Sequence, residues 1–97
     1  MKLEKLKQKN KITLDKQLSA MHSNDLKVIL LEALNDEKSL YLNASKVENI
    51  DTLCCQLLIS AQSSFLKSEL TFEINSPSEK FNATFNILGL QNVFVEA

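Results

Sequence analysis

Residues 40–58, LYLNASKVENIDTLCCQLL, decide the expected fold. The stretch reads as a short apolar strand, a polar loop, and then an acid and a hydroxyl that begin a helix. We expect Asp51 to cap that helix, because its carboxylate can accept from the unpaired amides of the next turn and lies at the positive end of the helix dipole. Thr52 is then the first helical residue, and the helix has an exposed tip.

The buried side of this predicted helix follows from the spacing of its apolar residues. They recur at helical intervals and would form one stripe, with the helix running to about Ser68. The stripe consists of Cys54, Leu57, Leu58, Ala61 and Phe65.

Strand and helix patterns alternate along the chain. Strands are expected at residues 11–14, 40–42 and 70–74, with a helix capped by Ser23 and ended by Asn35 between the first two. A strand, a helix and a second strand in this order form a βαβ unit, whose strands are parallel. Two such units predict an α/β domain.

The ends of the chain are read differently. Residues 1–10 indicate at best a short edge strand or tail, and residues 17–22 a connector. Near the other end, residues 76–79 combine a capping box with a proline at the first helical position, and Gly89 is placed to end that helix. Its apolar side would hold Phe81, Phe85 and Leu88, and Val93 to Val95 would form a short strand or tail.

The length and composition are those of one globular domain. The chain has 97 residues, a formal net charge of −1 and 44% hydrophobic residues. This balance does not indicate a nucleic-acid-binding face, although the first sixteen residues are rich in lysine. No apolar run is long enough to span a membrane, so we expect no membrane insertion and a cytoplasmic location.

Enzyme chemistry is poorly supported by the motifs. There is no glycine-rich phosphate loop, no nucleophile with a base and an orienting acid, and no cofactor motif. Cys54 and Cys55 are adjacent and the single His22 has no spaced partner, so no metal site is expected. Cys54 lies on the apolar stripe, where packing is a better interpretation than thiolate reactivity, and His22 is interpreted as a surface residue.

Residues 41–52 and 56–58 resemble the central pattern of the STAS domain family, found in sulfate transporters and anti-sigma-factor antagonists. Residues 76–78 and 87–90 resemble two later signatures of that family, so the likeness extends from about Leu14 onward. The resemblance implies a single STAS-like domain, with a mixed, mostly parallel sheet of four to five strands packed by three to four helices.

The resemblance also implies a function. In anti-sigma-factor antagonists, hydroxyls after the equivalent of Asp51 accept phosphate, and a kinase partner docks over the loop and helix tip. Thr52 is the corresponding phosphorylation candidate, but Leu53 occupies the second acceptor position and Cys54 stands where glycine is usual, which weakens the case for phosphoregulation. The expected partner-binding residues are Asn43, Ser45, Asp51, Thr52, Leu53, Cys55 and Gln56.

Two functions from different classes therefore stay open. The first is a signalling module that binds a kinase, anti-sigma or chemotaxis partner according to the state of Thr52. The alternative is an accessory subunit of a lipid-trafficking ABC transporter that docks on its ATPase with no phosphate involved. The details of the tip are similar to both chemotaxis-associated and transporter-associated STAS proteins.

Overall fold

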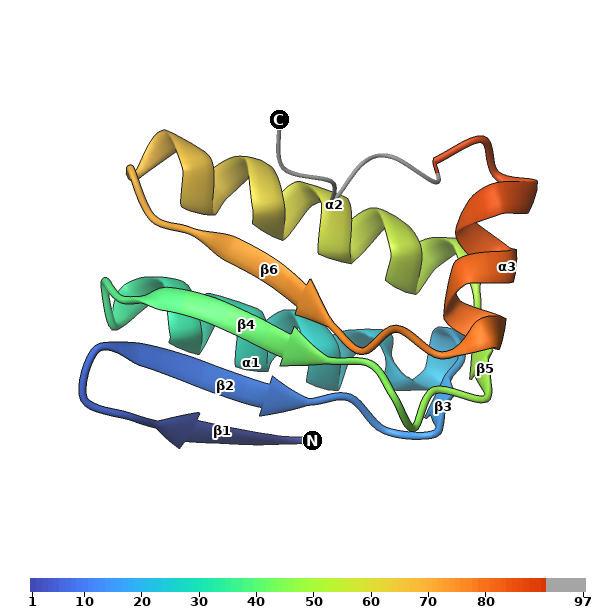
Figure 1. The fold of residues 1–97 in the computed structure, drawn as a ribbon, viewed down its shortest axis with the longest axis horizontal. Coiled ribbons are helices and arrows are strands. Elements are labelled where there is room, and N and C mark those ends of the chain that lie inside the picture. Colours follow the sequence, from blue (N-terminus) through green and yellow to red (C-terminus); the bar gives the residue numbers. More distant parts are fainter. Residues whose placement is uncertain (91–97) are drawn as a thin grey trace.

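A four-stranded sheet forms the centre of the computed structural model, which describes residues 1–90 (Figure 1). Its order is β1-β2-β4-β6, with β1 antiparallel to β2 and the other neighbours parallel. The expected parallel pairing of residues 40–42 with 70–74 is therefore confirmed. The strands are β1 (Lys2–Lys5), β2 (Lys9–Thr13), β4 (Ser39–Asn43) and β6 (Phe72–Asn75).

Two helices connect the parallel strands. Helix α1 (Ser23–Asn35) joins β2 to β4, and α2 (Thr52–Lys67) joins β4 to β6. They pack against one another, and Figure 1 shows α1 behind the strands and α2 above β6. Both helices start at the end of the sheet where β2, β4 and β6 finish. The α/β class, the mixed and mostly parallel sheet and the predicted βαβ units are confirmed.

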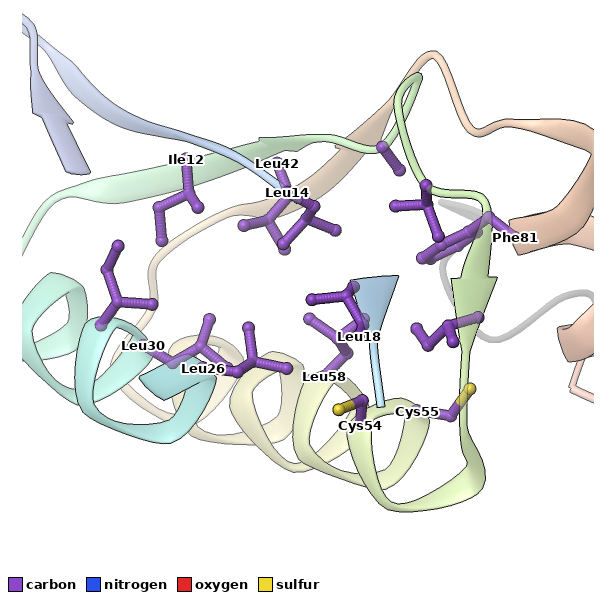
Figure 2. Close-up of a cluster of buried hydrophobic side chains, with 14 of the residues drawn as sticks. Ile12, Leu14, Leu18, Leu26, Leu30, Leu42, Cys54, Cys55, Leu58 and Phe81 are labelled. Carbon is purple, nitrogen blue, oxygen red and sulfur yellow. The ribbon is translucent and has the colours of Figure 1, made fainter. Parts of the chain in front are cut away.

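The core lies between the sheet and the two helices. Ile12 and Leu42 from the strands face Leu26, Leu30 and Leu58 from the helices (Figure 2). Each of these side chains has at most 5% of its surface exposed. Fully burying a leucine or isoleucine contributes roughly 1.5–3 kcal/mol, so this layer is the main source of stability.

The opposite face of the sheet is polar and open. Residues of β2 and β4 alternate, so that Lys9, Lys11 and Tyr41 lie on this face while their neighbours are buried. The Lys9 Nζ is 4.4 Å from the centre of the Tyr41 ring, and the Lys11 Nζ is 5.9 Å from it. The N-terminal lysines belong to the solvated surface, and residues 2–5 are the edge strand that the sequence only weakly indicated.

A second, smaller sheet lies where the parallel strands end. It pairs β3 (Gln17–Leu18) with β5 (Asn49–Ile50) in parallel, and a short 3₁₀ helix, η1 (Ala20–His22), follows β3. These residues were expected to be a connector and a loop. Strands of two residues have no alternating pattern from which to predict them, and their pairing depends on the two crossovers.

The expected ends of α1 need correction. Ser23 is the first residue of the helix and not its cap, because its hydroxyl donates to the Ala20 carbonyl of η1, 2.7 Å away. His22 occupies the cap position without a side-chain bond. At the other end, Asn35 keeps helical geometry, and the left-handed residue is Glu37, with a φ of 58°.

Helix α3 (Glu79–Ile87) also begins later than expected. Its cap is Ser78, whose hydroxyl accepts from the Phe81 amide at 3.1 Å, whereas Ser76 is a left-handed loop residue with a φ of 51°. Gly89 ends the helix as predicted, with a φ of 72°. Leu88 is 37% exposed, so it contributes less to the buried side than Phe81 does. The strand expected at Val93 to Val95 lies outside the described residues.

Candidate functional site

The start of α2 is fixed by Asp51. The Asp51 Oδ1 accepts from the Cys54 amide at 3.0 Å, which is the expected capping bond. Its own amide donates to the Leu18 carbonyl of β3 at 3.1 Å. Asp51 therefore connects the helix to the small sheet, and Thr52 is held at a defined position.

The loop before β5 is held by Asn43 and Ser78. The Asn43 Oδ1 accepts from the Ser45 amide at 2.9 Å, which forms an Asx turn directly after β4. The Ser78 hydroxyl donates to the Val47 carbonyl at 2.6 Å while also capping α3. A single serine thus joins the loop and α3. The sequence indicated only a helix cap near this position and not the bond to the loop.

The predicted contact residues divide into exposed and buried groups. Ser45, Thr52, Leu53 and Gln56 are exposed, and Asn43 and Asp51 are partly exposed. Leu53 has 46% of its surface exposed. We refer to these six residues as the α2 tip. They belong to the last residue of β4, the loop after it and the start of α2, at the end of the sheet that also holds α3 and the small sheet (Figure 1).

Cys55 does not belong to this surface. Both Cys54 and Cys55 are fully buried, as Figure 2 shows for the side of α2 that faces the core. The expectation that Cys55 contacts a partner is therefore corrected, because its side chain cannot reach one in this conformation. The expected packing of Cys54 is confirmed, and its Sγ lies 3.5 Å from the Ser19 carbonyl oxygen.

Burial also controls the chemistry of these thiols. Burial first, and the nearby negative charge of Asp51 second, raise the pKa of Cys54 from 9.0 to about 11. The same two causes raise the pKa of Cys55 to about 11. Because the thiolate is the nucleophilic form, both residues are poorly suited to reaction at neutral pH.

The other candidate catalytic side chains, Asp51 and His22, make structural hydrogen bonds. Asp51 faces the helix amide and not the Thr52 hydroxyl as a base would, since its bond is to Cys54. His22 lies 2.9 Å from the Ser19 hydroxyl through its Nδ1, which is a local contact across η1. Among residues 1–90, no group of three histidine, cysteine, aspartate or glutamate residues is arranged to hold a metal ion.

No helix in residues 1–90 is both long and apolar enough to cross a membrane. The longest described helix, α2, has 16 residues, and one of its faces packs on the sheet.

Comparison with known proteins identifies a family. Residues 1–96 match the family described as "Mlab, STAS domain". A solved structure titled "NMR Structure of the protein TM1081" is similar in fold, with a TM-score of 0.80 and 21% identity, over 96% of this chain and 76% of that chain. No curated protein sequence matches the chain.

Proposed function

Because this chain belongs to the STAS domain family, we propose that it binds another protein through the α2 tip, with Thr52 as a contact residue that tolerates no added negative charge. STAS domains are in general non-enzymatic regulatory modules that interact with proteins. The observation that carries the proposal is the exposed pair Thr52 and Leu53, held beside Asp51, which is partly buried and caps the helix.

The chemistry of the tip suits a protein contact. Leu53 offers exposed apolar surface, while Thr52 and Gln56 offer hydrogen-bonding groups without charge. Interfaces of this kind place apolar surface at the centre and depend on a rigid scaffold for specificity. In this protein, the hydrogen bonds of Asp51 to Cys54 and to Leu18 make the tip rigid.

Thr52 can act as a switch without a change in the fold. Phosphorylation would add about 1.5 to 2 negative charges next to Asp51, on a surface that a partner would cover. A buried and unpaired charge at an interface costs about 2–5 kcal/mol, enough to reduce affinity more than tenfold. The same argument holds for a glutamate in place of Thr52.

Two classes of partner fit this surface. One is a kinase, an anti-sigma factor or a chemotaxis protein, for which Thr52 phosphorylation would control binding. The second is the ATPase of a lipid-trafficking ABC transporter, on which the tip docks without phosphate. We favour the ATPase, because the residue after Thr52 is an exposed leucine and not a second hydroxyl, which suits a lasting apolar contact.

The test is co-purification from the source organism followed by mass spectrometry. Tagged wild type should recover an ABC transporter ATPase, and the Thr52→Glu variant should not. Thr71→Glu is the matched control, because Thr71 is also an exposed threonine but lies at the opposite end of the sheet, before β6. Recovery of a kinase or chemotaxis protein with wild type would replace the ATPase as partner, and equal recovery with Thr52→Glu would refute the role of the tip.

A further inference from the structure

The start of α2 is in contact with a segment that lies far from it in sequence. We refer to residues 19–22 as the η1 segment. The Ser19 carbonyl oxygen is 3.5 Å from the Cys54 Sγ. One residue earlier, the Leu18 carbonyl accepts from the Asp51 amide at 3.1 Å. Two consecutive carbonyls thus contact the capping residue of α2 and the residue whose amide it caps, so the position of the tip depends on this part of the chain.

Hydrogen bonds, and not burial, hold the η1 segment in place. None of residues 20–22 is buried, and Met21 is 83% exposed. The Ser19 Oγ lies 2.9 Å from the His22 Nδ1, and the Ser19 carbonyl accepts from the His22 amide, also at 2.9 Å. Segments with few buried apolar contacts open locally at a lower free-energy cost than the core does. The contact between the Ser19 and His22 side chains is therefore an important restraint, and it can be removed without a change in the backbone.

The Ser19 carbonyl connects this restraint to α2. It accepts from the His22 amide and also faces the Cys54 thiol, while the Ser19 side chain is held by the His22 ring. The Cys54 amide in turn donates to the Asp51 carboxylate at 3.0 Å. If the two side chains separate, the Ser19 peptide is less restrained, and both residues that fix the first turn of α2 lose part of their support.

We infer that Ser19 and His22 are positioning residues for the α2 tip, and that the contact between their side chains sets how often the start of α2 opens. The inference rests on the proposed function, because it adds a way to change binding at the tip from outside the tip itself. Order that exists before binding lowers the entropy cost of association. A tip that opens more often therefore binds more weakly, although every contact residue is intact.

A catalytic role for the same pair has less support. A serine and a histidine within hydrogen-bond distance can act as nucleophile and base, but the base is then oriented by a third group. Among residues 1–90, no carboxylate is bonded to the His22 ring, whose contact is with the Ser19 hydroxyl. The carbonyl of the same serine faces α2, so positioning is the better interpretation.

The experiment measures the hydrogen exchange of single backbone amides by NMR in the purified protein. Ser19→Ala should speed exchange at the Asp51 and Cys54 amides about two- to tenfold, the effect of losing one hydrogen bond. Ser19→Thr keeps the hydroxyl and should exchange as wild type does. His22→Ala and His22→Asn form a second pair, because asparagine places its Oδ1 where histidine has its Nδ1 and should restore the slow exchange.

Ser39→Ala is the matched control. The Ser39 Oγ accepts from the Thr71 amide at 3.0 Å, and Ser39 begins β4, at the opposite end of the sheet from the tip. This variant also loses one side-chain hydrogen bond, so it should speed exchange at the Thr71 amide and leave the Asp51 amide unchanged. If Ser39→Ala and Ser19→Ala affect the Asp51 amide equally, general destabilisation is the cause and the inference is overturned.

The outcomes separate this inference from the function on which it rests. If Ser19→Ala leaves exchange at Asp51 and Cys54 unchanged while Thr52→Glu prevents co-purification of a partner, only the inference is wrong. If Ser19→Ala speeds exchange as stated but tagged wild type recovers no protein, only the proposed function is wrong. Where wild type does recover a partner, Ser19→Ala should recover less of it than Ser19→Thr, and equal recovery would overturn the inference.

Discussion

Replacing Asp51 separates the two ways in which this residue stabilises α2. Its carboxylate accepts from the Cys54 amide at 3.0 Å, and its negative charge lies at the positive end of the helix dipole. Loss of a capping side chain costs roughly 0.5–2 kcal/mol, and loss of the favourable charge roughly 0.3–1 kcal/mol. Asp51→Ala removes both contributions and should lower the free energy of unfolding by about 1–2 kcal/mol.

Asp51→Asn is the matched variant. Asparagine caps helices about as well as aspartate but carries no charge, so the cost should be only about 0.3–1 kcal/mol. The measurement is urea unfolding followed by circular dichroism at 222 nm, with linear extrapolation to water. Near 1 M NaCl the Debye length falls to about 3 Å, so the difference between aspartate and asparagine should shrink while the alanine variant stays less stable. If the asparagine and alanine variants are equally unstable, the capping bond contributes nothing and the account of the tip is wrong.

Four further tests address the surrounding structure. Ser78→Ala removes a cap and a loop bond and should cost about 2 kcal/mol in the same urea assay; a cost below about 0.5 kcal/mol would contradict the joining role. Glu69→Gly should stabilise the folded protein by about 0.5–1 kcal/mol, because Glu69 has a left-handed φ of 61°. Ser68→Gly should destabilise it, because Ser68 has a φ of −91°. A stability change of the same sign in both variants would contradict this reasoning. The pKa values of Cys54 and Cys55 in the folded protein are raised to about 11. The stability that these thiols contribute is therefore full below pH 9 and is lost as the pH rises toward 11, on the order of 2 kcal/mol per thiol. The double variant Cys54→Ala, Cys55→Ala should lack this loss. At neutral pH, Cys54 should react with a thiol reagent far more slowly in the folded protein than in denaturant, and equal rates would exclude its packing.

Local signals explain which parts of the fold were predicted. The capping acid and the helical spacing after it are both contained in residues 51–65, so α2 could be placed from sequence. Gly89 could be assigned for the same reason, since a left-handed end strongly favours glycine. The two βαβ units followed from the order of these elements.

The parts that were missed depend on contacts distant in sequence. The β3–β5 pairing forms because two crossovers bring Leu18 beside Ile50, and neither strand is long enough to show a period. Serines flank Pro77 on both sides, and only the structure shows that Ser78 is the cap, with its hydroxyl also held by the distant Val47 carbonyl. Cys55 is buried in the core although it lies off the apolar stripe that the spacing predicts, so more than one side of the first turn of α2 is covered.

The exposure of the α2 tip could be predicted in part, while its role in binding stays a prediction. Thr52, Leu53 and Gln56 lie where a helix start should expose them, and their exposure follows from the cap at Asp51. The contact of the η1 segment with the start of α2 could not be predicted, because it exists only through the placement of Ser19 against Cys54. Periodicity shows which side of each helix is apolar but not which distant segment lies beside its start.

The affinity of the partner for Thr52→Glu tests the central claim most directly. Purified partner is titrated by isothermal calorimetry against wild type, Thr52→Ala, Thr52→Glu and the control Thr71→Glu, all shown to be folded by circular dichroism. Thr52→Ala should cost under about 1 kcal/mol of folding stability, because the side chain is exposed. The account predicts that Thr52→Glu binds more than tenfold more weakly than wild type while Thr71→Glu binds as wild type does. Equal affinity of Thr52→Glu and wild type would contradict it.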